Sequence, residues 1–183
     1  MRVITGTARG RKLQTLPGGD VVRPTGDKVK ESMFSIVQFE LQNAVVLDAF
    51  SGSGQLGIEA LSRGASKAYF LDASRDAIRV TQENLKTVGF FEKSVCLNTD
   101  ALTFLRTAKE KFDIVLLDPP YKAGLMEKVL PLVADSVSDS AWVLCESDAQ
   151  ESFPDQVGLL QKYREYKYSK TKLTVYRHKE AIL

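Results

Sequence analysis

Apolar residues recur along this chain with two different spacings, and the spacing changes from segment to segment. Short apolar runs, such as VVLDAF at 45–50 and FDIVLLD at 112–118, predict buried strands. Apolar residues three or four positions apart, as in GDKVKESMFSIVQFEL at 26–41, predict helices. The predicted helices are 26–41, 54–64, 74–89, 101–111 and 124–137, and the predicted strands are 45–50, 67–72, 94–99, 112–118 and 142–147.

The two ends of the chain differ from this centre. Residues 1–24 hold glycines, a Pro-Gly-Gly turn and scattered arginines, which predicts short strands and loops. Residues 159–179 alternate with period two around a turn at Ser169–Lys170, which predicts a hairpin. Pro131 falls inside the last predicted helix, where we expect a kink or a break.

Strands and helices alternate five times, which predicts an α/β fold with a doubly wound, mainly parallel sheet and helices on both of its faces. The hairpin brings the expected number of strands to seven and adds an antiparallel edge strand. In open α/β sheets the ligand binds beyond the carboxyl ends of the strands. In this chain these ends read DAFSGSG, LDAS, NTDA, LDPPY and CESD, and each contains at least one acid.

The loop after the first strand carries a glycine motif. Gly52, Gly54 and Gly57 match GxGxxG, which lets a backbone approach a nucleotide closely at the start of a helix. The motif alone is weak, because any tight strand-to-helix turn favours glycine. Its position between a strand and a helix strengthens it, as does Asp72 at the end of the next strand, which is placed to accept hydrogen bonds from both hydroxyls of a ribose.

The acids around this loop favour a cationic cofactor. Asp48 stands four residues before Gly52, where it would repel the pyrophosphate of a dinucleotide. S-adenosylmethionine (SAM) has no phosphate and carries a sulfonium and an amino group, which suit an acid there. Asp100 falls where an adenine amino group could bind, and Ala101 would supply a backbone N–H. Each acid alone could be a helix cap, but that explanation is poor for all three together.

The sequence DPPY at 118–121 suits a target amine conjugated to an aromatic ring. The lone pair of such an amine is delocalised, so a site must accept hydrogen bonds from its N–H groups. Asp118 offers a carboxylate, and the carbonyl of Pro119 is a second acceptor that Pro120 helps to hold in one direction. Tyr121 would provide a ring on which an extruded base stacks. A plain strand end with a Pro-Pro turn is the alternative.

Composition excludes several other classes. The chain has 183 residues, of which 44% are apolar and 26% charged, as in a globular domain. It has no apolar run long enough to cross a bilayer. The chain has a single histidine, His178, and two separate cysteines, Cys96 and Cys145, which argues against a zinc site of the usual spacing and against a histidine-dependent hydrolase. The unpaired thiols indicate a reducing cytosol.

The charges are segregated along the chain. Residues 1–30 carry seven Lys and Arg with two acids, and residues 161–179 carry seven Lys and Arg with one acid. Residues 31–160 carry eleven Lys and Arg with nineteen acids, although the net charge of the whole chain is only +2. Two basic ends either are solvated termini or hold a polyanion such as RNA.

With these motifs placed, the chain resembles the class I SAM-dependent methyltransferases, and within them the bacterial 16S rRNA guanine-N2 methyltransferases called RsmD. The resemblance extends over RVITGTARGRKL (2–13), RPTGDKVKESMFSI (23–36), DAFSGSGQLGIEALSRGA (48–65), NTDALTFL (98–105) and DIVLLDPPY (113–121). Two places depart from the family pattern. Gln55 stands where a small residue is commoner, and Asp72 and Ser74 stand where Glu and then Asp or Asn are usual.

The resemblance implies methyl transfer from SAM to the N2 amine of one guanine in 16S rRNA (guanine 966 in the family's usual naming), on the small ribosomal subunit or an assembly intermediate. It implies a small basic RNA-binding extension at 1–24 and a methyltransferase domain at 25–183. The expected RNA contacts are Arg9, Arg11, Lys12, Arg23 and Thr25. The expected cofactor contacts are Asp48, Phe50, Ser51, Gly52, Ser53, Gly54, Gly57, Asp72, Ala73, Asp100 and Ala101, and the expected catalytic residues are Asp118, Pro119, Pro120 and Tyr121.

We therefore expect a cytoplasmic monomer that binds neither a metal nor a membrane. Three alternatives stay open. One is an amine methyltransferase that acts on adenine N6 in DNA or on another RNA. The second is a nicotinamide-dependent oxidoreductase, which would leave Asp48 and the DPPY sequence unexplained. The third is a non-catalytic RNA-binding module that keeps the fold.

Overall fold

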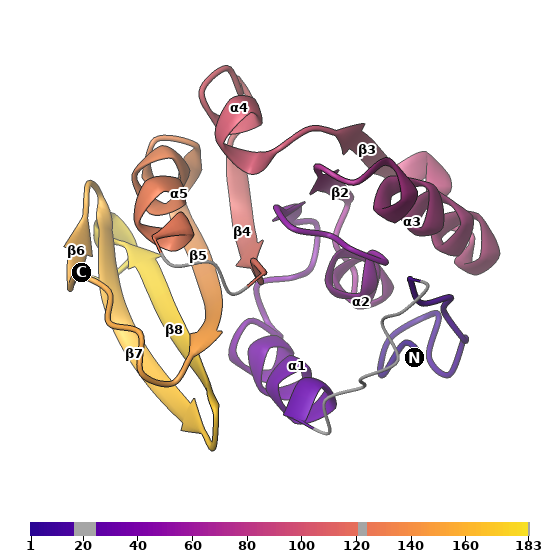
Figure 1. Ribbon diagram of the computed structural model, residues 1–183, viewed down its shortest axis with the longest axis horizontal. Helices are drawn as coiled ribbons and strands as arrows, with labels where there is room; N and C mark the ends of the chain where they lie inside the picture. Colours follow the sequence, from indigo (N-terminus) through magenta and orange to yellow (C-terminus); the bar gives the residue numbers. More distant parts are fainter. Residues whose placement is uncertain (17–24, 121–123, 183) are drawn as a thin grey trace.

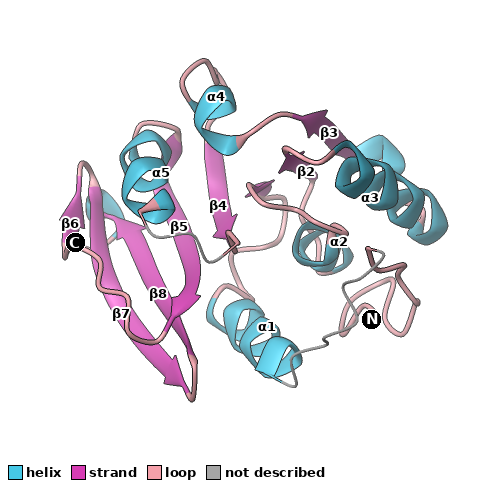
Figure 2. Ribbon diagram, in the orientation of Figure 1, coloured by secondary structure: helices cyan, strands magenta, loops and turns pink. Residues whose placement is uncertain are grey.

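The structure is a computed structural model, and it describes residues 1–16, 25–120 and 124–182. Its helices and strands follow one another in the alternating order expected (Figure 1, Figure 2). The helices are α1 (Thr25–Ile36), α2 (Gln55–Ser62), α3 (Arg75–Val88), α4 (Ala101–Leu105) and α5 (Leu125–Ala134), with short 3₁₀ turns η1 (Phe91–Lys93) and η2 (Lys179–Ala181). The strands are β1 (Val45–Asp48), β2 (Lys67–Asp72), β3 (Ser94–Asn98), β4 (Phe112–Leu117), β5 (Val137–Asp148), β6 (Gln156–Val157), β7 (Leu160–Tyr168) and β8 (Thr171–His178).

The strands form one sheet in the order β3-β2-β1-β4-β5-β8-β7-β6. The pairs among β1 to β5 are parallel, and those that join β5, β8, β7 and β6 are antiparallel. The predicted mainly parallel sheet with an antiparallel edge is therefore confirmed. The described chain has eight strands rather than seven, because the two-residue β6 is too short to leave a pattern in the sequence.

The central strands are buried on both faces, as parallel strands covered by helices must be. Alternate residues of β1 and β2 enter different clusters: Val46 and Phe70 pack on the side of α1, α2 and α3, whereas Leu47 and Leu71 pack on the side of α4 and α5. These strands consequently read as continuous apolar runs, and the prediction of helices on both faces is confirmed. No helix in the described part of the chain is both long and apolar enough to span a membrane.

Several element boundaries differ from the expected ones. The first helix ends at Ile36 instead of residue 41, although Val37 and Leu41 stay fully buried in the turns that follow. The fourth is only five residues long. Of the kink or break expected at Pro131, the break is wrong, because α5 continues through Pro131 to Ala134. The fifth strand begins at Val137 rather than residue 142, since its polar Ser-Asp-Ser segment hides the extended backbone.

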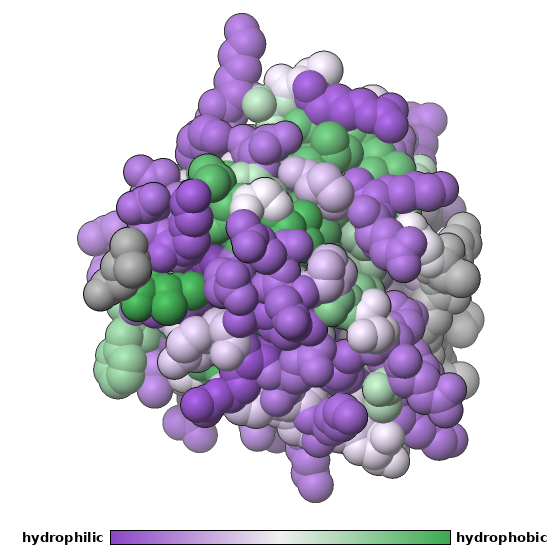
Figure 3. All heavy atoms as spheres, turned by 90° about the vertical axis from the view of Figure 1, so that its left-hand side faces the viewer, coloured by the Kyte–Doolittle hydropathy of each residue, from purple (hydrophilic) through white to green (hydrophobic). Residues whose placement is uncertain are grey.

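Residues 1–16 pack against the domain instead of projecting from it. Val3, Ala8 and Leu13 belong to the same core cluster as α1, α2 and α3. One antiparallel bridge, between Arg2 and Lys12, is the only strand-like pairing described in this segment. At the other side of the molecule, Figure 3 looks onto β6 and β7 and shows mostly hydrophilic side chains, as expected for a solvent-facing sheet edge.

Candidate active site

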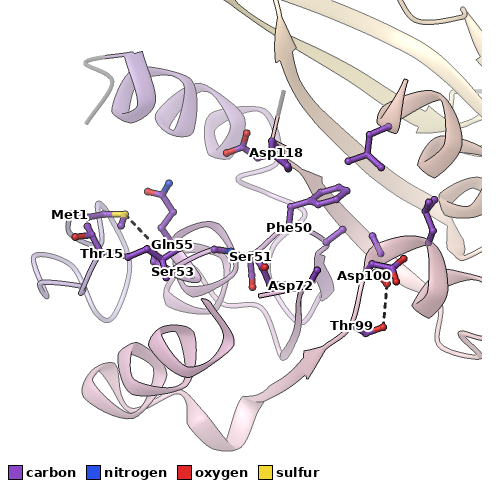
Figure 4. A pocket seen from close by; sticks show the side chains of 18 residues that line it. Met1, Thr15, Phe50, Ser51, Ser53, Gln55, Asp72, Thr99, Asp100 and Asp118 are labelled. Atoms are coloured by element: carbon purple, nitrogen blue, oxygen red, sulfur yellow. Dashed lines mark hydrogen bonds between the residues drawn. The ribbon is translucent and has the colours of Figure 1, made fainter. Parts of the chain in front are cut away.

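A pocket of about 580 Å³ lies at the carboxyl edge of the sheet, where β1, β2, β3 and β4 end (Figure 4). Ten of the predicted site residues line it: Phe50, Ser51, Gly52, Ser53, Asp72, Ala73, Asp100, Ala101, Asp118 and Pro120. The sequence motifs that are separate in the chain thus meet at one place, as the rule for ligand sites in open α/β sheets predicts.

The glycine loop forms the floor of the pocket, and each glycine has its own physical reason. Gly52 and Gly54 adopt positive φ angles of 53° and 82°, which other residues rarely adopt. Gly57 is needed for packing: a Cβ atom there would lie 2.3 Å from a ring carbon of Phe70 on β2. The first two glycines therefore shape the loop, whereas the third lets α2 approach the sheet closely.

Asp48 lies behind this loop and is 1% exposed. Its Oδ2 accepts a hydrogen bond from the Gly57 N–H at 2.9 Å, whereas its Oδ1 has no partner among the described residues. Burial raises the pKa of Asp48 to about 7, and the negative charges of Asp118 and Asp72 add to this rise. A buried carboxylate oxygen without a donor indicates a missing ligand or water. A cationic ligand would fit this position.

Asp72 ends β2 with both carboxylate oxygens held by backbone. Oδ2 accepts from the Gly52 N–H at 3.0 Å and Oδ1 from the Ser74 N–H at 2.8 Å. These bonds fix the carboxylate at the pocket wall and tie β2 to the glycine loop. Each oxygen keeps one further lone pair, so the group can still accept two hydrogen bonds from a bound molecule.

Asp100 is the N-cap of α4. Its two oxygens accept from the Thr103 N–H at 2.9 Å and from the Thr103 hydroxyl at 2.6 Å, and these bonds lower the pKa of Asp100. The capping role is therefore real for this acid, and the predicted contact with an adenine stays a prediction. Asp100 and the neighbouring Ala101 nevertheless line the pocket. In the view of Figure 4, the Phe50 side chain lies between Asp118 and Asp100.

The predicted catalytic segment follows β4. Asp118 and Pro120 line the pocket, and Pro119 lies between them in the chain. In Figure 4, Asp118 lies on the other side of Phe50 from Asp100. Tyr121 lies outside the described residues. A carboxylate is thus held at the end of a buried strand, facing a cavity whose far wall carries Asp72 and Asp100.

The predicted RNA contacts lie next to this pocket only in part. Arg9, Arg11 and Lys12 are exposed on the N-terminal segment, whose ends reach the pocket through Met1 and Leu16. Arg23 and the side chain of Thr25 lie outside the described residues. In the described ranges no group of three His, Cys, Asp or Glu side chains could hold a metal ion.

The residues that sequence reasoning missed at the site include five close to the predicted ones, Ala49, Gln55, Thr99, Leu102 and Leu125, and two further groups. Met1, Thr15 and Leu16 line the pocket, although nothing in their type pointed to it. Thr81 and Asn84 of α3 are buried and donate to the carbonyls of Gly52 and Ser53 at 3.0 and 2.8 Å. The signal that could have found Thr81 and Asn84 is their position, because these polar residues are three positions apart on the inner face of a helix.

Comparison with known proteins identifies the family to which the chain belongs. Residues 1–177 match the family model described as "Conserved hypothetical protein 95", which is the family of RsmD. The chain is an RsmD-like methyltransferase.

Relatives within this family support the assignment. The chain is 36% identical over 156 residues to "Ribosomal RNA small subunit methyltransferase D" of Escherichia coli, covering 84% of this chain and 78% of that protein. It is 38% identical over 139 residues to the protein of the same name from Haemophilus influenzae, covering 74% and 72%. A solved structure described as "Putative methyltransferase yhhF from Escherichia coli" superposes with a TM-score of 0.88 at 32% identity over 98% of both chains.

Proposed function

We propose that this RsmD-like chain transfers the methyl group of SAM to the exocyclic N2 amine of one guanine in 16S rRNA, the base called 966 in the family's usual naming. The observation that carries the proposal is the pocket that the glycine loop, Asp72, Asp100 and Asp118 line together, with the buried carboxylate of Asp48 behind that loop. The names of the E. coli and H. influenzae relatives support a small-subunit rRNA substrate.

The residues of the pocket fit SAM. Asp48 and the glycine loop would face its cationic amino acid end, Asp72 would accept from the ribose hydroxyls, and Asp100 with Ala101 would face the adenine. When bound, this cofactor supplies an electrophilic methyl group on a sulfonium. A phosphate-bearing dinucleotide fits less well, because its pyrophosphate would approach Asp48 and Asp72.

Asp118 and the Pro119 carbonyl would act on the target base. By accepting hydrogen bonds from the two N–H groups of the guanine amine, they favour a pyramidal nitrogen whose lone pair is free to attack. The cofactor would supply the methyl group, and its sulfur would keep the electron pair of the broken S–C bond. Asp118 would be placed to receive the proton that the amine gives up and to pass it to water. No strong base is needed, since the amine becomes acidic once it bears the methyl group.

Features of the chain also support the proposed substrate. Exposed Arg9, Arg11 and Lys12, on the segment whose ends line the pocket, suit an RNA backbone. A ribosomal particle can be selected by shape as well as by base sequence. We propose that the protein acts as a cytoplasmic monomer.

A methyl-transfer assay with labelled SAM tests the proposal. Undermethylated small subunits, protein-free 16S rRNA and duplex DNA are offered in parallel, and the labelled nucleoside is identified after digestion. We expect N2-methylguanosine from the subunits. Label in N6-methyladenine from DNA would keep the amine chemistry but overturn the substrate. SAM binding without any transfer would favour a non-catalytic RNA-binding module.

A further inference from the structure

The N-terminal segment, residues 1–16, forms one wall of the pocket. Met1, Thr15 and Leu16 line the cavity together with the glycine loop, and the Ser53 hydroxyl lies 3.9 Å from the sulfur of Met1. Figure 4 shows Met1 and Thr15 beside Gln55 and Ser53, at the opposite end of the pocket from Asp100. This wall therefore faces the part of the pocket that would receive the amino acid end of SAM.

The first anchor of this wall is Asn84, which is 1% exposed on α3. Its Oδ1 accepts from the Gln14 N–H at 2.8 Å, and its Nδ2 donates to the Gln14 carbonyl at 3.0 Å and to the Ser53 carbonyl at 2.8 Å. One amide side chain thus joins the wall, next to Thr15, with the glycine loop. All three bonds are to backbone, so they fix the path of the chain.

The second anchor is Glu59, which is fully buried on α2. Its carboxylate accepts from the Ile4 and Thr5 N–H groups at 2.8 and 2.9 Å. Arg63 at 2.8 Å and the buried Lys30 at 3.4 Å balance its charge. A carboxylate with two cations and two backbone donors is satisfied, so burying it does not leave an unpaired charge.

The chain between the anchors follows the end of α2 closely. Ser62 accepts from the Ala8 N–H through its hydroxyl at 3.0 Å and from the Thr7 N–H through its carbonyl at 2.8 Å. At Gly6, with φ +86°, a Cβ atom would lie only 1.8 Å from the Ser62 carbonyl oxygen. The segment is therefore fitted to the domain on both sides of exposed Arg9 and Arg11.

We propose that residues 1–16 are a built wall of the SAM pocket and that Asn84 is the positioning residue that holds this wall against the glycine loop. The inference rests on the proposed function. Because Arg9 and Arg11 belong to the same anchored segment, the wall links the cofactor pocket to the surface that meets RNA. If SAM contacts the wall, its binding must stabilise the closed wall by the same free energy by which the closed wall strengthens SAM binding.

The first experiment measures SAM affinity by calorimetry for the wild type, Asn84→Ala and the control Thr87→Ala. Thr87 lies on the exposed face of the same helix, and its hydroxyl bonds only within that helix. We expect about tenfold weaker binding for Asn84→Ala and none of this change for the control. In the methyl-transfer assay the KM for SAM should rise by the same factor, while kcat at saturation stays within about twofold. A loss of fold alone would not produce this split.

A second variant covers the case in which Asn84→Ala does not fold, as judged by circular dichroism. Thr15→Trp leaves every hydrogen bond of the anchors in place and adds a large side chain to the wall. Weaker SAM binding by about tenfold supports the wall, and an unchanged affinity overturns it. If the wild type itself binds no SAM, the proposed function fails as well. If it binds SAM and both variants bind equally well, only this inference fails.

The reciprocal effect is measured by limited trypsin digestion after Arg9 and Arg11, followed by mass spectrometry. Saturating SAM should slow this cleavage about fivefold in the wild type and in Thr87→Ala, because opening of the wall must then compete with binding. The protection should be lost in Asn84→Ala. Equal cleavage with and without SAM in the wild type would contradict the proposal.

Discussion

At the scale of single residues, Asp118 is the side chain on which the proposed chemistry depends most. Replacing Asp118 with Ala removes one of the two acceptors for the target amine. We expect kcat to fall roughly 10²- to 10³-fold, the cost typical of losing one preorganised polar contact in a transition state. SAM affinity should change less than about threefold, because the other pocket residues remain. The measurement is methyl transfer to small subunits at saturating SAM.

The matched control for this change is Asp76→Ala, which removes an exposed acid from the first turn of α3. It should leave turnover unaltered. If Asp118→Ala turned over at the wild-type rate, the proposed mechanism would be wrong, even though the fold is that of a methyltransferase.

Asp48 should make SAM binding depend on pH. Its pKa of about 7 in the free protein means that much of it carries a proton below neutrality, whereas a cationic ligand favours the ionised form. Binding must then release that proton, so affinity should be about tenfold lower at pH 6 than at pH 8 and level above pH 8. Calorimetry across this range measures it. Asp48→Asn should bind more weakly at pH 8 and show no such slope.

The same shift has a consequence for stability. The folded pKa of about 7 lies above the ordinary value of 3.8, so between these values the folded state holds a proton that the unfolded chain has lost. Stability from this group is fully present below pH 3.8 and falls as pH rises toward 7. Relative to the wild type, Asp48→Asn should therefore gain stability between pH 4 and pH 7. Thermal melts of both proteins at a series of pH values measure this difference in stability. If the melting temperatures of the two proteins changed in parallel with pH, Asp48 could not be a buried group that is neutral below pH 7.

Sequence and structure agree unevenly at this scale. The acids at the strand ends were predictable, because parallel strands bring their carboxyl ends to one edge. The anchors were not: Asn84 meets Gln14 across 70 positions of sequence, and Glu59 meets Ile4 across 55. A helix pattern assigns a residue to a face but says nothing of which distant backbone it will meet.

At the scale of elements, the contact of α2 with β2 through Gly57 and Phe70 can be tested directly. Gly57→Ala would place a Cβ atom 2.3 Å from the Phe70 ring, which must then move. We expect a loss of about 1–3 kcal/mol in the free energy of unfolding, as for other overpacked cores. Adding Phe70→Leu should recover part of this loss, because the smaller side chain clears the contact. Denaturant unfolding of both single variants and the double variant measures the coupling.

Gly26→Ala is the control for this cycle. Among the described residues, no atom outside its own helix and chain neighbours lies within 4 Å of a Cβ there, and its φ is not in the left-handed range, so stability should stay level or rise by up to about 1 kcal/mol. Strictly additive losses for Gly57→Ala and Phe70→Leu would mean that the two elements do not meet as described.

The limits of prediction are clear for β5 and β7. The apolar half of β5, from Ala141 to Cys145, was predictable because it is buried on both faces. Its first residues after Val137 were not, since Asp139 and Ser140 are exposed. The hairpin pattern was read correctly, but the alternation is broken by a register shift between Lys162 and Arg164. Propensity and period indicate strands only where one face stays buried.

At the scale of the whole molecule, the topology shows where the two basic ends of the chain lie relative to the sheet. Register pairs Asp148 at the end of β5 with Thr171, so the turn of the β7–β8 hairpin lies at the carboxyl edge of the sheet, the edge that carries the pocket. The exposed Lys167 and Lys170 of that hairpin therefore lie at the edge that the two ends of the N-terminal segment also reach, with α1 between the hairpin and this segment (Figure 1). The sequence revealed two basic ends, but only the topology shows that the hairpin turn and the ends of residues 1–16 come to the same edge of the sheet.

Not every basic residue of the hairpin is available to RNA. Lys172 is buried and pairs with Glu165 at 3.1 Å, and Lys162 pairs with Asp155 at 3.0 Å. Part of the basic C-terminal charge is thus neutralised by neighbouring acids.

One tyrosine of the hairpin is part of the core. Tyr176 is fully buried, and its hydroxyl donates to the Pro154 carbonyl at 2.7 Å, as expected for a hairpin packed on one face.

If both basic regions hold rRNA, each should contribute to binding and neither to chemistry. The variants Arg9→Ala/Arg11→Ala and Lys167→Ala/Lys170→Ala each remove two charges, the first pair from the N-terminal segment and the second from the hairpin turn at the carboxyl edge. We expect the KM for small subunits to rise about tenfold in each, and the slope of log KM against log salt to fall by about 1.5–2, because two phosphate contacts are lost. The kcat at saturation should stay within about twofold.

The matched control removes the same charge from the opposite edge. Lys93 and Lys109 are exposed just before β3 and β4, at the amino ends of those strands, so Lys93→Ala/Lys109→Ala changes the net charge equally without approaching the pocket. If attraction to RNA were set by net charge alone, all three double variants would raise KM alike. If the hairpin variant matched this control while the N-terminal variant did not, the basic hairpin would be a solvated edge, and rRNA would be held by the N-terminal segment alone.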